Sequence, residues 1–331
     1  MPMLRILAFP FSLIYALVVH FRNFLYDNGI FASKSFETST ICVGNLSVGG
    51  TGKTPMIEYL IRLLEGRNVA ILSRGYKRKS KGFVLANADS KVEELGDEPF
   101  QIHKKFPNAI VAVDAERRNG IGQLKSIVKP DVILLDDAYQ HRKVKPKFSI
   151  LLTAYGKLYI NDWYLPTGNL RDSKSEAKRA NIIIVTKCPE NISEAERSSI
   201  VKKLKPLPHQ YVLFSMLKYQ KNVQGADHKT LPLESLQGKK VALVTGIASP
   251  DPLLQHLKSK EVDFTHFGYA DHHDFSAKEI QEFSGFEIVL TTEKDYVRLE
   301  GKLNKLYYLE VAHSFSEEDA KFLGQSIKKL I

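Results

Sequence analysis

Short apolar runs alternate with amphipathic stretches through most of this 331-residue chain. Up to about residue 208 the apolar runs predict strands at Ser39–Val43, Val69–Leu72, Ala109–Val113, Val132–Leu135, Phe148–Leu152 and Ile182–Val185. Helical patterns separate them, for example at Pro55–Leu64 and Arg117–Ile127. Because strands that are apolar on both sides must be covered on both sides, we expect an α/β fold with a mostly parallel sheet between helices.

The pattern changes near Pro206, where a more polar stretch indicates a linker or a small hairpin. A second α/β pattern then predicts strands at Val241–Gly246, Val262–His266, Phe286–Thr291 and Leu306–Leu309. The chain is also longer than a usual single domain. We therefore predict a core domain at residues 29–208, a linker at 209–235 and a smaller C-terminal α/β domain at 236–331.

The N-terminal segment, residues 1–28, has a different character. Residues 6–19 carry no charge, but this run is shorter than the roughly 20 apolar residues that a spanning helix needs, and Pro10 interrupts it. Aromatic and aliphatic residues beside Arg5, His20 and Arg22 are typical of a helix that lies in the membrane interface. An ordinary core helix is the alternative. We favour a membrane-associated helix.

Charge and composition limit the classes of partner that we expect for this chain. The net charge of +10 favours an anionic partner or substrate, although a general solubility charge explains it equally well. The basic residues form short scattered clusters without a nucleic-acid-binding module, so we expect no nucleic acid. The two cysteines, Cys42 and Cys188, lie in or beside apolar runs, which predicts free thiols and a reducing, cytoplasmic setting.

The strongest local motif is a glycine-rich loop between a strand and a helix. Gly49, Gly50, Thr51 and Gly52 precede Lys53 and Thr54, although Ser47 replaces the first glycine of the common pattern. Glycines let successive amide N–H groups face phosphate oxygens at a helix N-terminus. We expect this P-loop to bind a nucleotide, with Lys53 on the β- and γ-phosphates and the Thr54 hydroxyl on Mg²⁺.

A second strand ends in adjacent carboxylates, Asp136 and Asp137. Carboxylates at a strand end beside a P-loop can hold Mg²⁺ directly or through water, so we predict a metal site at Thr54, Asp136 and Asp137. Gln140 and His141 follow at once and either face the same cleft or pack in hydrogen-bonded positions.

Three further clusters carry ionisable groups. Asp97, in the sequence Gly-Asp-Glu-Pro, is either a base for a substrate hydroxyl or a helix cap. His272 and His273 lie among aspartates and aromatics, either beside a catalytic carboxylate or in a solvated loop. Arg74, Arg117 and Arg171 can bind phosphate groups, although most single arginines are surface charges.

Taken in order, these motifs resemble those of the tetraacyldisaccharide 4′-kinase family, the lipid A 4′-kinases. The matching segments are Leu25-Tyr26, Gly44–Pro55, Ser73–Tyr76, Gly96–Pro99, Leu135–His141, Leu165–Arg171, Val185–Pro189, Asp271-His272 and Thr291–Asp295. Ala138-Tyr139 stands where Gly-Phe is commoner, while Ser47 suits the family.

The resemblance implies a P-loop NTPase-like core and transfer of the ATP γ-phosphate to the 4′-hydroxyl of a tetraacyl glucosamine disaccharide 1-phosphate. It places this reaction on the cytoplasmic face of the inner membrane of a Gram-negative bacterium, with the protein peripheral or monotopic. No obligate protein partner is evident from the sequence. Because His272 falls in the second predicted domain, we also expect a catalytic cleft that closes between the two domains.

The resemblance also implies residue roles. Asp97 is the general base, supported by His272 rather than His273, and Lys53 and Arg171 are catalytic. Arg117 contacts phosphate with the P-loop, whereas Arg74 and Tyr76 meet the substrate.

Two rival functions remain at this stage. A P-loop kinase for a soluble metabolite uses the same phosphate machinery but needs no apolar N-terminus. A GTPase-like nucleotide switch is suggested by Thr186-Lys187 at a strand end, but Pro189 stands where the guanine-reading aspartate belongs.

Overall fold

The computed structural model describes residues 3–247 and 249–331. Residues 1 and 2 of the predicted N-terminal segment and residue 248 of the predicted C-terminal domain lie outside the described residues.

The apolar runs of the first two thirds form one sheet in the order β3-β4-β2-β5-β1-β6-β7-β8. The strands are β1 (Ser39–Asn45), β2 (Val69–Ser73), β3 (Val84–Leu85), β4 (Ile110–Val113), β5 (Val132–Asp136), β6 (Phe148–Ala154), β7 (Ile182–Thr186) and β8 (Tyr211–Gly225). All neighbours pair in parallel except β3 and β4. Every residue of β1, β2, β5, β6 and β7 is buried, which explains their uninterrupted apolar character.

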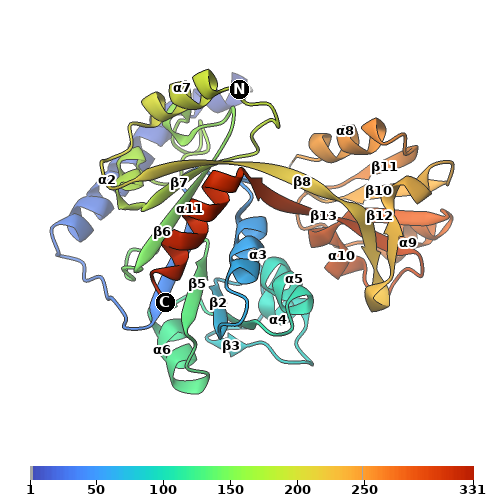
Figure 1. The fold of residues 1–331 in the computed structure, drawn as a ribbon, viewed down its shortest axis with the longest axis horizontal. Coiled ribbons are helices and arrows are strands. Elements are labelled where there is room, and N and C mark those ends of the chain that lie inside the picture. The colour runs from blue at the N-terminus through green and yellow to red at the C-terminus, as the bar shows by residue number, and fades with distance from the viewer. Residues whose placement is uncertain (1–2, 248) are drawn as a thin grey trace.

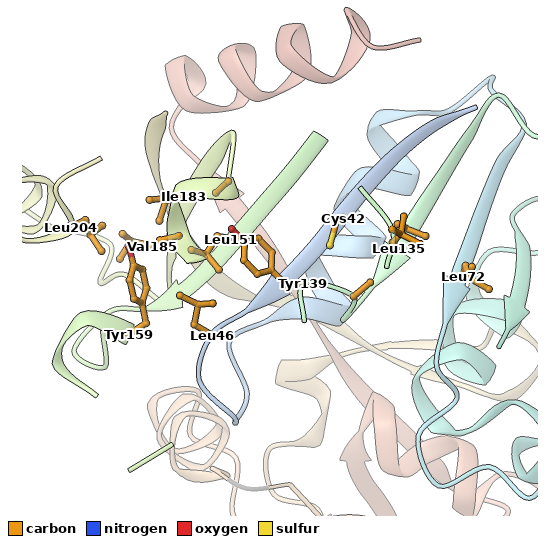
Figure 2. Close-up of a cluster of buried hydrophobic side chains, with 14 of the residues drawn as sticks. Cys42, Leu46, Leu72, Leu135, Tyr139, Leu151, Tyr159, Ile183, Val185 and Leu204 are labelled. Carbon is orange, nitrogen blue, oxygen red and sulfur yellow. The ribbon is translucent and has the colours of Figure 1, made fainter. Parts of the chain in front are cut away.

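The helices are α1 (Met3–Leu7), α2 (Phe9–Asp27), α3 (Lys53–Leu63), α4 (Val92–Leu95), α5 (Asp97–Lys105), α6 (Arg117–Ile127), α7 (Glu194–Leu204), α8 (Asp251–Ser259), α9 (Ala277–Ser284), α10 (Glu293–Leu299) and α11 (Glu317–Lys328). Apolar residues of α3, α5 and α11 share one buried cluster with the large sheet, and residues of α6 and α7 share the cluster on its other face. Figure 2 shows part of this second cluster, which gathers the loop residues Leu46 and Tyr139 with side chains of the strands β1, β5, β6 and β7. The prediction of a mostly parallel sheet covered by helices is confirmed.

A smaller sheet, ordered β11-β10-β12-β13, is built from β10 (Val241–Thr245), β11 (Phe264–Gly268), β12 (Ile288–Thr292) and β13 (Leu306–Phe315) in parallel. Strand β8 leaves the large sheet and pairs antiparallel with β13, while β9 (Thr230–Pro232) pairs with β8. This long β8–β13 ribbon joins the two halves of the molecule (Figure 1).

Two segments differ from the sequence expectation. Most of the expected linker at 209–235 is strand β8, because its residues pair first with β7 and then with β13. Helix α11, which falls in the expected C-terminal domain, returns to the large sheet, where Leu323 and Ile327 are buried in its core (Figure 1). The apolar positions of α11 cover a sheet face that would otherwise be exposed. The exact domain boundaries stay a prediction.

The N-terminal residues fold as α1 and α2 (Figure 1), and α2 is hydrogen-bonded to the segments that follow β5 and β6, at Arg142 and at residues 164–172. Across residues 3–247 and 249–331, no helix combines the length and the apolar character that crossing a membrane requires.

Candidate active site

The P-loop connects β1 to α3 as the sequence predicts. Gly49 and Gly52 have φ angles of 115° and 85°, in the left-handed region that favours glycine. The loop is held from outside, because Asn45 donates from its side-chain amide to the Thr51 hydroxyl at 2.9 Å, and the Thr186 hydroxyl donates to the Thr51 carbonyl at 2.8 Å. Lys53 and Thr54 begin α3, where the first amide N–H groups have no partner within the helix. The loop therefore has the geometry of an anion site.

Strand β5 pairs with β1 so that Val43 lies opposite Asp136, which brings both aspartates to the P-loop. Asp137 has a φ of 46°, an uncommon conformation for a residue other than glycine, and its carboxylate accepts both terminal nitrogens of Arg171. Lys53 Nζ lies 3.8 Å from the same carboxylate. One charged group beside the P-loop therefore consists of Lys53, Asp137 and Arg171.

The two aspartates have different electrostatic environments. Burial and the charge of Asp137 raise the pKa of Asp136 to about 6, and the carboxylate accepts a 2.9 Å hydrogen bond from the Ser73 hydroxyl. Burial also acts to raise the pKa of Asp137, but Lys53 and Arg171 outweigh it and lower this pKa. Asp136 is therefore the member of the pair that a further cation would stabilise most.

Arg117 lies next to the backbone of the aspartate pair. Its side chain is 2% exposed, and its guanidinium donates to the carbonyls of Asp114 at 2.6 Å and Asp136 at 3.3 Å. Neither of these hydrogen bonds reaches P-loop residues 49–54. In this arrangement Arg117 supports the backbone that carries the aspartate pair.

A second group of charges lies where the two halves of the molecule meet. Asp97 begins α5 and is 3% exposed. His272 Nδ1 lies 2.5 Å from its Oδ2, and Arg298 of α10 donates from Nε to Oδ1 at 3.0 Å and from Nη2 to Oδ2 at 2.7 Å. His272 has a φ of 63°, and its Nε2 is 3.2 Å from Lys294 Nζ. The structure therefore brings together Asp97 and His272, which are 175 residues apart.

His273 lies differently from its neighbour. Its Nε2 is 3.0 Å from Glu279 Oε1, and its ring stacks on Tyr269 within the smaller half. Of the two histidines, His272 is the one that contacts Asp97.

The loop after β2 connects the two charged groups. Ser73 bonds to Asp136, while the backbone of Gly75 and Tyr76 packs directly against Gly96; a Cβ atom on Gly96 would lie 2.8 Å from the Tyr76 carbonyl oxygen. This close approach places Asp97 beside the end of β2. The exposed Tyr76 ring lies 5.5 Å from the His272 ring.

Arg74 lines a hollow of about 430 Å³ between α2 and the loop that follows the aspartate pair. The other lining residues are Arg22, Tyr26, Ala115, Glu116, Gln140, His141, Arg142 and Lys143. Gln140 donates to the Asn45 carbonyl at 2.8 Å, and His141 Nε2 lies 3.3 Å from Glu116. Both residues after the aspartate pair therefore pack in hydrogen-bonded positions at the edge of this hollow.

Helix α2 is docked by its polar side. Ser12 donates to the Tyr164 carbonyl, the Tyr15 hydroxyl donates to the Arg171 carbonyl, and Asn23 donates to Asp172, all within 3.0 Å. The outward side is apolar, and large exposed side chains are Phe11, Leu13, Ile14, Leu17, Val18, Phe21 and Phe24. A surface helix of a protein surrounded by water has the opposite orientation.

Comparison with known proteins shows to which family the chain belongs. The family model for tetraacyldisaccharide-1-P 4′-kinase, LpxK, matches residues 4–330. The chain belongs to this kinase family. Among the relatives of the 4′-kinase family, the tetraacyldisaccharide 4′-kinases of Flavobacterium johnsoniae and Flavobacterium psychrophilum are each 51% identical, over 97% of this chain and 96% of theirs. A crystal structure of LpxK from Aquifex aeolicus in complex with ATP superposes with a TM-score of 0.81 at 32% identity, covering 99% of both chains.

Reasoning from the sequence of this 4′-kinase family member missed several residues that contact the predicted ones. Arg298 and Lys294 surround Asp97 and His272, and Asn45 holds both the P-loop and Arg171. Asn45 lies in the P-loop motif and could have been found there. Lys294 lies within the Thr291–Asp295 motif and Arg298 follows it three residues later, but nothing local indicates that α10 faces α5.

Proposed function

We propose that this chain is an ATP-dependent kinase that transfers the γ-phosphate to the 4′-hydroxyl of a tetraacyldisaccharide 1-phosphate in lipid A biosynthesis. The observation that carries the proposal is the P-loop with its aspartate pair, in a chain that matches the 4′-kinase family over residues 4–330. The resemblance inferred from the sequence and the family match agree.

The nucleotide occupies the P-loop. Amide N–H groups from Gly49 to Thr54 bind the triphosphate, and Lys53 lies against the β- and γ-phosphates. Transfer forms a bond between the acceptor oxygen and the γ-phosphorus while the bond to the β,γ-bridging oxygen breaks. Lys53 and Arg171 offset negative charge on the transferred group, and both already converge on Asp137.

The residues present fit a magnesium site at Thr54, Asp136 and Asp137. Asp136 has a pKa raised to about 6 by burial and by its anionic neighbour, so a divalent cation there relieves an unfavourable charge arrangement. When bound, Mg²⁺ supplies positive charge next to the phosphate oxygens.

Asp97 accepts the proton of the acceptor hydroxyl. Its carboxylate is held by Arg298 and by His272, so its orientation is defined before the acceptor arrives. His272 touches the base and supports it, and Tyr76 offers an exposed ring beside it for the sugar. Because Asp97 and His272 come from the two halves of the molecule, the base is assembled only when these halves meet, as a closing cleft between domains requires.

The glycolipid reaches the site from the side of α2. The exposed apolar face of α2 lies in the membrane interface at the cytoplasmic face of the inner membrane, as in a peripheral or monotopic protein. Arg74 and Arg22 line the hollow next to α2 and favour the anionic 1-phosphate end of the acceptor there. The polar docking of α2 disfavours the rival of a kinase for a soluble metabolite.

The test is phosphoryl transfer from γ-labelled ATP to the tetraacyl disaccharide 1-phosphate in detergent micelles, with and without Mg²⁺. The matched control acceptor already carries a phosphate at the 4′ position and must remain unlabelled. Equal activity on a deacylated, soluble disaccharide would favour the soluble-metabolite kinase. Slow nucleotide hydrolysis without a labelled acceptor would favour a nucleotide switch.

A further inference from the structure

His313, on strand β13 of the ribbon that joins the two halves, contacts the P-loop. The side chain is 6% exposed, its Nε2 lies 2.9 Å from the Gly52 carbonyl oxygen, and its Nδ1 lies 2.9 Å from the Ser215 hydroxyl on β8. The motifs discussed so far do not include it.

The partners of the ring define its tautomer. A carbonyl oxygen only accepts hydrogen bonds, so Nε2 carries the proton that points to Gly52, and Nδ1 accepts from the Ser215 hydroxyl. Burial lowers the pKa of His313 to about 4, with a smaller contribution from Lys187, so the ring stays neutral near pH 7. His313 is thus a fixed hydrogen-bond donor to the loop.

This contact helps to fix which way a loop amide faces, because the Gly52 carbonyl accepts from His313 as well as from the Met56 N–H of α3 at 3.1 Å. The Gly52 carbonyl and the Lys53 N–H belong to one planar trans peptide and point in opposite directions. The preceding peptide is held in the same way, because the Thr186 hydroxyl donates to the Thr51 carbonyl. With both carbonyls bound from outside, the N–H groups of Gly52 and Lys53 point to the other side, where a phosphate must lie.

The loop sequence is adapted to the approach of the ring. A Cβ atom on Gly52 would lie 3.0 Å from His313 Nε2, which is closer than most side chains allow. The same strand carries Glu310, which pairs with Arg62 of α3 at 2.6 Å. Strand β13 therefore contacts α3 near its start and again near its end.

We propose that His313 is a positioning residue for the nucleotide, which orients the P-loop amides from the ribbon that carries the smaller half of the molecule. The inference rests on the proposed function in that the loop must bind ATP. It adds that the ribbon, and not the core sheet alone, sets the affinity of the loop for phosphate.

Four enzymes test it: wild type, His313→Phe, His313→Gln and His313→Asn. Phenylalanine keeps the ring without the donor. The glutamine amide nitrogen reaches the position of Nε2, whereas that of asparagine reaches only the position of Nδ1. Each variant is assayed for KM of ATP and of the glycolipid, for direct binding of a fluorescent ATP analogue and for melting temperature.

We expect His313→Phe and His313→Asn to raise the KM for ATP and weaken analogue binding about tenfold, the effect of one lost hydrogen bond to a buried carbonyl. His313→Gln stays within about threefold of wild type, and the KM for the glycolipid changes less than about twofold in all three.

An unchanged KM for ATP in folded His313→Phe would overturn the inference. So would equal increases in both KM values, or a glutamine variant no better than the asparagine variant, since both indicate packing alone. If His313→Phe does not fold, the glutamine and asparagine pair decides. A wild-type protein that binds no nucleotide would instead refute the proposed function.

Discussion

Replacing Asp97 by asparagine separates its proposed chemistry from its packing. The carboxylate is 3% exposed and is bound by His272 at 2.5 Å and by Arg298 at 2.7 and 3.0 Å. Asparagine keeps the volume of the side chain and one acceptor oxygen, but it cannot accept a proton from a hydroxyl group. We therefore expect kcat to fall by about 10²–10⁴-fold, the usual contribution of a general base. The KM for ATP should change less than about twofold, because the carboxylate contacts no P-loop residue.

Asp97→Asn should also lower the free energy of unfolding. Removing one partner of a fully buried ion pair costs about 3–5 kcal/mol. Arg298 keeps a 2.8 Å contact with Asp274 and its bonds to the carbonyls of His272 and His273, so we expect a smaller loss of about 1–3 kcal/mol. The melting temperature should fall by several degrees without loss of the folded state at 25 °C.

The assay is single-turnover transfer to the acyl disaccharide, with melting curves and ATP titrations on the same preparations. Asp274→Asn is the matched control, because it removes the other carboxylate bound to Arg298 from a side chain that is almost fully exposed. This control should keep kcat within about twofold of wild type. The reasoning would be refuted by a folded Asp97→Asn enzyme whose turnover stays within about tenfold of wild type.

Three further changes test other parts of the site. Lys53→Met removes the cation beside Asp137 and should lower kcat/KM for ATP by at least about 10², measured by ATP titration; an unchanged ratio would exclude Lys53 from phosphate contact. Burial and the charge of Glu58 raise the pKa of Glu293 to about 8. Below the ordinary pKa of a glutamate, the carboxyl is protonated in the folded and the unfolded protein alike. As pH rises from there to about 8, only the unfolded protein ionises, so the free energy of unfolding falls. Glu293→Gln cannot ionise, and its melting temperature relative to wild type should rise between about pH 5 and 9, whereas a pH-independent difference would contradict the assignment. Phe11→Glu combined with Leu17→Glu should lower sedimentation with anionic phospholipid vesicles at least tenfold, since each buried apolar side chain contributes about 1.5–3 kcal/mol. Ile127→Glu, at an exposed apolar position on α6, is the control, and equal binding by both proteins would argue against α2 as the membrane face.

The features that could be predicted from the sequence are those encoded within a few residues. Apolar runs such as Val132–Leu135 became buried strands because both of their faces need cover, and helix α6 spans the predicted residues Arg117–Ile127. The P-loop was readable because its glycines and Lys53 act through the local backbone. The aspartate pair was readable because parallel strands end at the same edge of a sheet.

Other features depend on which distant segments meet. Arg298 lies 201 residues from Asp97, and no local pattern states that α10 packs on α5. The outward apolar face of α2 is set by polar contacts to the segment at 164–172, so the apolar run alone could not give its orientation.

The sequence by itself determined most strands of the two sheets, the phosphate chemistry and, through its motifs, the kinase family. Only the tertiary structure decided that α11 returns to the core, that Arg298 holds the proposed base and that His313 touches the P-loop. The physical reason is the range of the interactions. Backbone conformation and side-chain periodicity act between near neighbours, whereas hydrogen bonds across the β8–β13 ribbon and between the two halves exist only once the chain has folded.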